Sequence, residues 1–592
     1  MTKASPTLVY DGDCAFCCYW VRYWQRLTGE QVRYLPLKQA TKEFPKLDAE
    51  ACRRAIHWIE GTDVQTGAAA AAKVLRTVPG FRLWPLLYRW LPGMAWISER
   101  AYAAISKQRG LSAMTSRLLW GKERYPETYQ RVIWLFERWL GLIFLIAFCS
   151  LWIQVEGLIG SDGLLPAKDY LADIGRMIPG PEKFWMLPTA LWLADADWML
   201  HALCVLGAVG AVLCMANRLA WVGLLLCYLS YLSLQAAGQM FLGYQWDLLL
   251  LECGFLALFL RLAPRLAVTL YRWLLFRFMF LSGLVKLSSQ DASWADWTAL
   301  NYHFETQPLP NPLAWYADQL PTSLLTVLVA LTLFIELVLP FLFFAARRLR
   351  LVAFSLTIAL QLAIIVTGNY NFFNLLVLGL CLFLLDDRML SFCTKQIEPT
   401  RWRWPTWVLG PTLGLGFLVI GSAHIWMTVV QRLPPSPLID VMRAVSPLQA
   451  VNSYGVFAVM TTERLEVVVQ GSNDAEDWLD YEFKYKPGAT DRGLPLVAPH
   501  QPRLDWQMWF AALSNRYRQP WFERMMTGVL KGEPQILNLL DGNPFPDQPP
   551  KFVRAQTYLY RFTTPQQRAE TDQIWVRELR GEYFPVSTLN RP

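Results

Sequence analysis

Two cysteines near the start of the chain have the spacing of a redox pair. Cys14 and Cys17 follow the apolar run Thr7–Tyr10 and stand where a helix is expected to begin. A thiol at that position faces unpaired backbone N–H groups and the positive end of the helix dipole, which favours its thiolate. Cys14 is therefore the candidate attacking thiol, and Cys17, one turn later, is the candidate partner in a disulfide. The carboxylates of Asp11 and Asp13 oppose a further negative charge nearby.

Two other interpretations of this cysteine pair stay open. Structural zinc takes four ligands, and Cys14, Cys17, Cys52 and His57 would supply them. The pair can also be vestigial and serve only in packing. A reducing cytosol argues against a permanent disulfide, so we favour thiol exchange, with no metal and no bound cofactor.

Charged side chains also fall inside two consecutive apolar runs, where a charge is costly unless it has a partner. Asp247 and Glu252 lie in one run, and Arg277 and Lys286 lie in the next. If the two runs form an antiparallel hairpin, residues at equal depth pair Glu252 with Arg277 and Asp247 with Lys286. We interpret them as intramembrane ion pairs that fix helix register; the alternative is a polar cavity for a substrate or a proton. Glu336, in a later run, has no comparably clear partner.

A segment without Lys or Arg separates two of the apolar runs, and it contains His303 and Glu305. These two side chains share a face if the segment is extended. Two candidate ligands do not make a metal site. We therefore interpret them as residues of an extracytoplasmic loop, for which a structural role is commoner than a chemical one.

The C-terminal region is rich in aromatic side chains, which suit either a core or the recognition of extended apolar segments. Most of them are expected in the core. His500 and Arg503 lie in a predicted loop, from which they can also cap a neighbouring helix, and Trp506 and Trp509 follow them. These four residues are our candidate contacts to a bound partner protein.

Composition and hydropathy indicate the kind of domain in which each of these residues lies. Of the 592 residues, 54% are hydrophobic and only 17% are charged, compared with about 25% charged in an ordinary soluble protein. Short strand-like runs alternate with helical segments in residues 1–124, which is typical of an α/β domain. Residues 433–592 begin with a proline-rich break and contain strand-like runs at 465–470 and 481–485, which predicts a soluble β-rich α+β domain.

Residues 125–432 are predicted to form a polytopic all-α membrane domain of about nine spans. The apolar runs are long enough to cross a bilayer. They lie at 134–155, 198–217, 219–237, 241–260, 266–287, 322–346, 350–367, 371–385 and 406–430.

Most cations beside these runs lie on one side of the predicted bundle, which the positive-inside rule places in the cytoplasm. They are Arg117, Lys122, Arg124, Arg131, Arg218, Arg261, Arg265, Arg347, Arg348, Arg350, Arg388, Lys395, Arg401 and Arg403, against Lys168, Arg176 and Lys183 on the other side. The N-terminal domain is thus expected in the cytoplasm and the C-terminal domain outside it. The first residues lack the apolar stretch of a cleavable signal peptide. The net charge of +8 is not gathered on one soluble face, so a nucleic acid is not an expected partner.

The cysteine motif resembles the DCC family of thiol-disulfide oxidoreductases, named for a motif that Asp13-Cys14 and Cys17 match. The resemblance covers the first of the three parts and implies a thioredoxin-like fold. It continues through Ile56-His57-Trp58-Ile59, Gly67, Ala101-Tyr102 and Arg109.

The rest of the chain resembles the lipase maturation factor family, from about Tyr125 almost to the C-terminus. The resemblance is carried by Trp152 to Gly160, Gln245-Trp246-Asp247, Lys286, Tyr302 to Pro310, Thr367 to Asn374 and Pro499 to Phe510. It implies a membrane protein of the endoplasmic reticulum in eukaryotes that is needed for the folding of secreted lipases. The fused thiol domain departs from the eukaryotic pattern and suggests a bacterial inner-membrane protein. The membrane region is also similar, more distantly, to the domain shared with vitamin K-dependent carboxylase, in which Lys286 would be the suspected catalytic lysine.

These observations predict a membrane-embedded maturation factor or chaperone for secreted proteins. The expected partners are the lipid bilayer, a secretory client for which a lipase is the candidate, and a cytoplasmic thiol protein. The alternative is a membrane thiol-disulfide oxidoreductase that uses Cys14 and Cys17. A weaker alternative is a carboxylase-like or lipid-modifying membrane enzyme.

Overall fold

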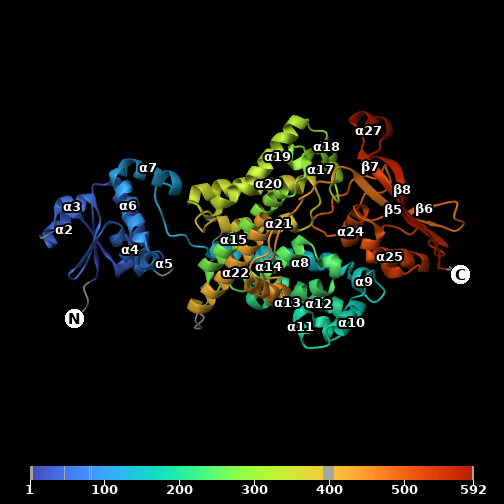
Figure 1. Cartoon of the computed structure of the whole chain (residues 1–592), viewed down its shortest axis with the longest axis horizontal. Coiled ribbons are helices and arrows are strands. Elements are labelled where there is room, and N and C mark those ends of the chain that lie inside the picture. The colour runs from blue at the N-terminus through green and yellow to red at the C-terminus, as the bar shows by residue number, and fades with distance from the viewer. Residues whose placement is uncertain (1–4, 46, 79–80, 82, 391–405, 590–592) are drawn as a thin grey trace. The chain divides into compact units, whose positions relative to one another are not determined.

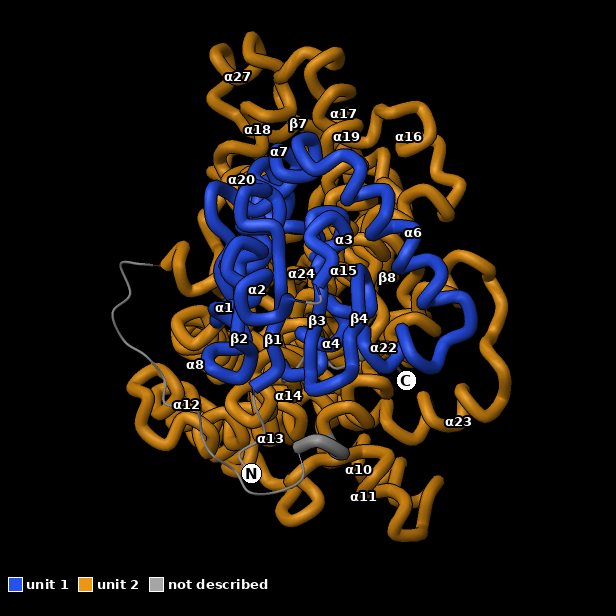
Figure 2. The backbone as a smooth tube through the Cα atoms, turned by 90° about the vertical axis from the view of Figure 1, so that its left-hand side faces the viewer, with its two compact units in different colours: residues 1–128, 344–352 blue, residues 129–343, 353–592 orange. Residues whose placement is uncertain are grey.

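The computed structural model describes residues 5–45, 47–78, 81, 83–390 and 406–589. The chain divides into two compact units (Figure 1; Figure 2): unit 1 comprises residues 1–128 and 344–352, and unit 2 comprises residues 129–343 and 353–592. The predicted flanking cations Lys395, Arg401 and Arg403 lie outside the described residues.

Unit 1 is built on a four-stranded sheet with the strand order β2-β1-β3-β4. The first two strands are parallel, and β3 runs antiparallel to both β1 and β4. The strands are β1 (Thr7–Tyr10), β2 (Arg33–Pro36), β3 (His57–Glu60) and β4 (Asp63–Thr66). The helices are α1 (Ala15–Thr28), α2 (Leu37–Glu43), α3 (Ala49–Arg54), α4 (Gly67–Thr77), α5 (Leu83–Trp90), α6 (Met94–Lys107) and α7 (Arg109–Trp120). The predicted α/β character of the N-terminal region is confirmed.

The start of α4 shows why the sequence needs Gly67 at that point. Its φ of +61° lies in the left-handed region, and a Cβ atom would stand 2.7 Å from a carboxylate oxygen of Glu99. That carboxylate accepts hydrogen bonds from the backbone N–H groups of Ala68 and Ala69. Glu99 of α6 therefore caps the N-terminus of α4 and joins the two helices.

Within the described residues of the chain, seven helices are long and apolar enough to cross a membrane. The prediction of nine spans is therefore not confirmed. The seven segments are α8 (Gln130–Trp152), α12 (Asp197–Met215), α13 (Ala220–Ala237), α15 (Pro264–Ser288), α19 (Thr322–Leu337) with its extension to Phe344, α20 (Arg347–Thr367) and Gly410–Val430 of α22 (Thr406–Val430).

The two remaining apolar runs form shorter helices, α14 (Gln245–Ala257) and α21 (Phe373–Cys381). The 13 residues of α14 span only about 20 Å, less than the roughly 30 Å of a hydrocarbon core. Most of α14 is buried by its neighbours. Hydropathy does not distinguish a helix buried in protein from one that crosses lipid, which accounts for the difference between nine predicted spans and seven long apolar helices.

Short helices connect the spans or precede the C-terminal domain. They are α9 (Val155–Ile159), α10 (Ala167–Met177), α11 (Glu182–Met186), α16 (Ala292–Ala295), α17 (Leu300–Thr306), α18 (Pro312–Asp318) and α23 (Ser436–Val445). The first span is anchored by Asp387, whose carboxylate accepts from the backbone N–H groups of Gln130, Arg131 and Val132. An acid at this position satisfies N–H groups that the helix itself leaves free.

The C-terminal domain contains an antiparallel sheet with the order β6-β5-β7-β8, which confirms its predicted β-rich character. The strands are β5 (Arg464–Ser472), β6 (Leu479–Tyr481), β7 (Phe552–Phe562) and β8 (Trp575–Ser587), and the helices are α24 (Arg503–Ala512), α25 (Pro520–Lys531), α26 (Pro534–Leu537) and α27 (Pro565–Thr571).

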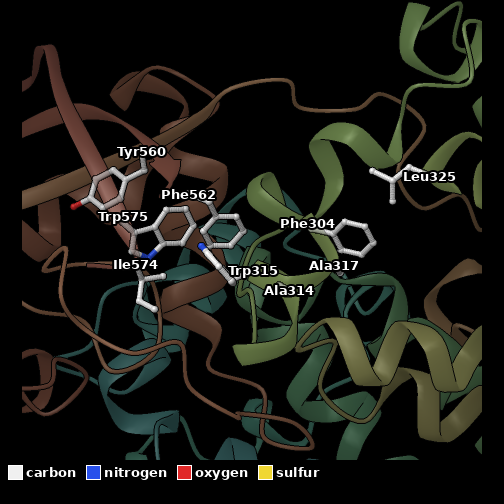
Figure 3. Packing of buried hydrophobic residues seen from close by; sticks show 9 residues of the cluster. All are labelled: Phe304, Ala314, Trp315, Ala317, Leu325, Tyr560, Phe562, Ile574 and Trp575. Carbon is white, nitrogen blue, oxygen red and sulfur yellow. The ribbon is translucent and has the colours of Figure 1, made fainter. Parts of the chain in front are cut away.

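One hydrophobic cluster joins this sheet to helices α17, α18 and α19 (Figure 3). Phe562 of β7 and Trp575 of β8 stack with their ring centroids 4.3 Å apart. Trp315 of α18 donates from its indole nitrogen to the carbonyl of Thr563 at 2.9 Å. The helical core and the C-terminal domain therefore share one interior within unit 2.

Candidate functional site

Cys14 is the residue that caps helix α1, directly after strand β1. The backbone N–H of Cys17 donates to the Cys14 sulfur at 3.3 Å, and both thiols are half-buried. A sulfur that accepts this N–H is held at the positive end of the helix, as the spacing predicts.

Arg109 of α7 brings a cation to the same place. One guanidinium nitrogen donates to a carboxylate oxygen of Asp11 at 3.2 Å, and the other donates to the backbone carbonyls of Arg53 and Arg54. Burial raises the pKa of the Cys17 thiol to about 12 and the neighbouring Cys14 adds to this shift, whereas the Arg109 guanidinium opposes it. Cys17 is thus protonated at neutral pH, whereas the Cys14 sulfur lies at the positive end of helix α1.

The zinc interpretation of this region does not fit the structure. Among the described residues, no three His, Cys, Asp or Glu side chains gather in a group that could hold a metal ion. Cys52 packs in a hydrophobic cluster, and the His57 ring nitrogen Nδ1 lies 3.0 Å from the carbonyl oxygen of Ala55.

Inside the helical core, Glu252 of α14 and Arg277 of α15 form the predicted ion pair, and both side chains are fully buried. The second carboxylate oxygen of Glu252 accepts from the Asn452 backbone N–H at 2.8 Å and from the Tyr454 hydroxyl at 2.7 Å. Arg277 donates to the carbonyl of Asn452 at 2.7 Å. Residues that follow the last span thus complete the hydrogen bonding of a pair that would otherwise be costly to bury.

Asp247 does not pair with Lys286, so this part of the prediction is wrong. Its two carboxylate oxygens face the guanidinium of Arg503 at 2.8 and 3.0 Å, and the Tyr231 hydroxyl donates to one of them at 2.5 Å. Arg503 belongs to α24 of the C-terminal domain, where its side chain is 1% exposed. Matching depths within a single hairpin cannot reveal a partner that comes from 256 residues further along the chain.

Lys286 pairs instead with Glu336 of α19, the acid without an evident partner in the sequence. Its ammonium lies 2.8 and 3.0 Å from the two carboxylate oxygens and donates to the Ser282 carbonyl at 3.0 Å. All three N–H groups of the lysine are therefore used.

The four candidate client contacts lie at the junction between the C-terminal domain and the helical core. Arg503 and Trp506 are 1% and 4% exposed, so the folded chain does not present them to a client, which corrects that prediction. The His500 ring bonds the Ser150 hydroxyl of α8 at 2.8 Å, and Trp509 donates to the Thr306 carbonyl at 2.9 Å. Burial lowers the pKa of His500 to about 4, and the cations of Arg503 and Lys484 lower it further.

His303 and Glu305 do not share a face, because their segment is helix α17 rather than an extended loop. The Glu305 carboxylate accepts from the backbone N–H of Phe562 at 2.7 Å and helps to hold β7. The His303 ring lies 3.3 Å from the Tyr370 hydroxyl. Burial lowers the pKa of His303 to about 4, with Lys286 adding to the effect, so the ring is neutral.

A cavity of about 370 Å³ lies beside these residues. Its walls come from α14, α15, α16, α17, α19, α20, α21, the segment 455–459 and α24. Lys286, Glu336, His303 and Tyr370 line it together with Trp506. Segments that the sequence analysis singled out one by one thus meet around a single internal space of the size typical of small-molecule sites.

Three family models match successive parts of the chain. A model described as the lipase maturation factor transmembrane domain matches residues 131–392, and one described as the lipase maturation factor C-terminal domain matches residues 450–585. A model described as DCC1-like thiol-disulfide oxidoreductase matches residues 8–113. Lipase maturation factor 2 of Gallus gallus is 37% identical, over 77% of this chain and 81% of its own length. The chain belongs to the lipase maturation factor family.

Further members give the same result. Lipase maturation factor 2 of Homo sapiens is 36% identical over 77% of this chain and 83% of its own length. Lipase maturation factor 1 of Bos taurus is 34% identical over 76% of this chain and 87% of its own length. No solved structure matches the chain.

Two buried charged residues that hold this structure together were not identified by the sequence analysis. Arg464 of β5 is buried and donates to the carbonyls of Glu305, Gln307 and Pro308. Glu137 of α8 is buried and takes two hydrogen bonds from Arg261, at 2.7 and 2.6 Å. An acid inside an apolar run was the available signal for Glu137, whereas nothing local marks Arg464.

Proposed function

We propose that this protein is a membrane-embedded maturation factor that assists the folding of secreted proteins, with lipases as clients. The observation that carries the proposal is the buried pair of Asp247 and Arg503, which ties the C-terminal domain to the helical core. A C-terminal domain held by buried charges on a membrane core suits a fixed platform on which an exported chain folds. The names of the relatives, lipase maturation factors 1 and 2, supply the client class, and we extend it to this chain.

We also propose that the two soluble regions lie on opposite sides of the membrane. The seven spans found within the described residues are an odd number, and counting α14 and α21 as well would give nine, which is also odd. With nine crossings the cation distribution favours a cytoplasmic N-terminal unit and an extracytoplasmic C-terminal domain. With seven crossings Arg261, Arg265, Arg347, Arg348 and Arg350 would change sides, so the proposal rests on counting α14 and α21 as crossings. A bacterial inner membrane stays a prediction from the fused thiol domain, whereas the relatives named above are animal proteins.

A second function, thiol-disulfide exchange in unit 1, is favoured by the geometry around Cys14. The strand order and directions of the sheet suit a thioredoxin-like fold. The Cys14 thiolate would attack a partner disulfide and form a mixed disulfide, and the Cys17 thiol would then displace the partner's thiolate. The carboxylase-like alternative receives less support, because the ammonium of Lys286 is already paired with the carboxylate of Glu336 and is not free to act as a base.

The test is the secretion of active enzyme by cells that lack the factor and express a secreted lipase. Restoration by the full chain, loss with Arg503→Met and retention with a Cys14→Ala and Cys17→Ala double variant would support the maturation role. Loss with the double cysteine variant alone, together with mixed disulfides trapped by Cys17→Ala, would make thiol exchange the main function. The exposed Arg176→Met change is the matched control, and immunoblotting checks that each variant accumulates.

A further inference from the structure

The cavity described above has the composition of a binding site for an apolar molecule with a small polar group. Aromatic and aliphatic side chains form most of its wall. Sites for small molecules are typically concave and largely apolar, with a few placed polar groups that fix orientation. The polar groups present here define the chemistry of the occupant.

The charges at the cavity cancel, which argues against a charged occupant. The ammonium of Lys286 is matched by the carboxylate of Glu336, and its third N–H is used by the Ser282 carbonyl. The imidazole of His303 is neutral at physiological pH because burial lowers its pKa to about 4. Bringing an ion into this space would cost its hydration without a free countercharge to offset the loss.

Two indole N–H donors at the cavity wall are buried and unused, as is the hydroxyl of Tyr244. The indole N–H groups of Trp246 and Trp506 have no hydrogen-bond partner within the described part of the chain. Their side chains are 6% and 4% exposed, and their ring centroids lie 4.7 Å apart. An unmet buried donor is costly, so both N–H groups favour an occupant that carries an acceptor oxygen.

The position of the cavity indicates where such a molecule comes from. Thr332 of α19 and the pair Leu360 and Ile364 of α20 line the cavity and are only half-buried, although both helices are membrane spans. The wall formed by these helices therefore borders the surface that faces lipid. An occupant that dissolves in the bilayer can reach this wall without crossing water.

We propose that this cavity binds an uncharged lipid that carries a carbonyl group, of the monoacylglycerol class, with its ester carbonyl accepting hydrogen bonds from Trp246 and Trp506. The acyl chain lies against the aromatic wall. The site is separate from the thiol pair of unit 1, and the proposal does not depend on the identity of the protein client.

Photocrosslinking of the full chain in lipid nanodiscs tests this assignment. The probe is a monoacylglycerol with a diazirine and an alkyne in its acyl chain, and labelled peptides are identified by mass spectrometry. We expect labelling of the cavity-lining parts of α14, α20 and α24. Monoolein should compete at a concentration at least about tenfold lower than oleic acid or oleoylcholine, because ions lack a countercharge here. Equal competition by oleic acid, or labelling only outside these helices, would overturn the proposal.

Two kinds of variant separate a built site from adventitious lipid. Trp246→Phe and Trp506→Phe keep an aromatic ring but remove the donor, and each should lower labelling by about fivefold to tenfold. Ala458→Phe places a ring in the cavity and should abolish labelling. Trp521→Phe is the matched control, because the Trp521 indole already donates to Gln519 at 2.8 Å and does not line the cavity.

Labelling is compared only among variants that elute from size-exclusion chromatography as the wild-type chain does. If one tryptophan variant fails this check, the other and Ala458→Phe still decide the matter. Unchanged labelling in both Ala458→Phe and either tryptophan variant would refute the site.

Discussion

The dithiol unit and the membrane-embedded unit use charged residues in opposite ways. In unit 1, the Lys38 and Asp13 side chains that pair beside the cysteine motif are 79% and 73% exposed. In unit 2, Arg503 and Asp247 are 1% and 0% exposed, as side chains, and Arg277 and Glu252 are both at 0%. The first kind of pair contributes little to stability, whereas breaking the second kind leaves an uncompensated buried charge.

This difference separates residues that can be altered singly from residues that act as parts of the fold. Cys14 and Cys17 are half-buried and sit on one short segment, so their chemistry can change while the sheet is kept. Asp247 and Arg503 hold two domains together. A functional defect in a variant of Asp247 or Arg503 therefore has to be interpreted together with a measurement of stability.

The largest expected effect is that of Arg503→Met, which leaves Asp247 buried without its cation. We expect a loss of about 3–5 kcal/mol in the free energy of unfolding. Unfolding of the purified chain in mixed micelles, followed by tryptophan fluorescence, measures this loss.

Double substitution provides the check on this prediction. If the pair acts as a unit, Asp247→Asn combined with Arg503→Met costs clearly less than the sum of the two single changes. Arg176→Met, in an exposed pair with Asp173, should change little. Additive effects of the two buried changes would mean that the pair is not energetically coupled.

A smaller loss is expected from Gly157→Ala in α9, at the contact between the helical core and the C-terminal domain. A Cβ atom there would stand 2.5 Å from the Gln535 carbonyl oxygen and 2.7 Å from a Leu539 carbon. Forcing the two backbones apart should cost about 1–3 kcal/mol, measured as a lower midpoint of thermal unfolding. Gly416→Ala in α22 has nothing within 4 Å and should be neutral or stabilising. Equal behaviour of the two variants would contradict close packing at Gly157.

The junction should also weaken in acid because of His500. Its pKa is about 4 in the folded chain, below the usual 6.5, so the unfolded chain binds the proton first as pH falls. Its contribution to stability is therefore present above pH 6.5 and is lost progressively down to about pH 4. We expect the thermal midpoint to fall between pH 7.5 and pH 5, and to fall less in His500→Asn. An unchanged pH profile in that variant would exclude the assignment.

Asp318 supplies a control of opposite sign. Burial raises its pKa to about 7, with Glu305 adding to the shift, so its contribution to stability is lost as pH rises from about 4 to 7. It therefore works against His500 in the tested range. Asp318→Asn should make the fall in thermal midpoint between pH 7.5 and pH 5 larger than in the wild-type chain.

The sequence predicted contacts between residues that are close along the chain and missed contacts between residues that are far apart along it. The thiol pair, its strand and its helix lie within one short segment, and the pattern located them correctly. The pair of Glu252 and Arg277 was predicted because, in two consecutive antiparallel helices, the distance of a residue from the turn gives its depth in the membrane. The partner of Asp247 was missed because it enters from another domain, which no local period encodes.

The sequence also does not show which individual aromatic residues of the C-terminal region are buried and which are exposed. Trp506 is buried and lines the cavity, although an aromatic side chain would suit a client-binding surface as well. Likewise α17 contains His303 and Glu305 in a helix too short to give a periodic signal. The span count of nine is not confirmed for a related reason, since an apolar helix can be buried in protein instead of lipid.

The smallest expected effect belongs to unit 1 and tests whether its charges tune chemistry rather than hold the fold. Removing the cation beside the thiols in Arg109→Met should slow alkylation of Cys14 by iodoacetamide about fivefold, the equivalent of roughly 1 kcal/mol for a charge at 4 Å in water. Arg109→Lys keeps the charge and should recover most of the rate. In each case Cys17 should stay unlabelled from pH 6 to 9, because its pKa is about 12. Peptide mapping of the alkylated chain measures both thiols, and an equal rate of labelling at Cys14 and Cys17 would contradict the division of roles between them.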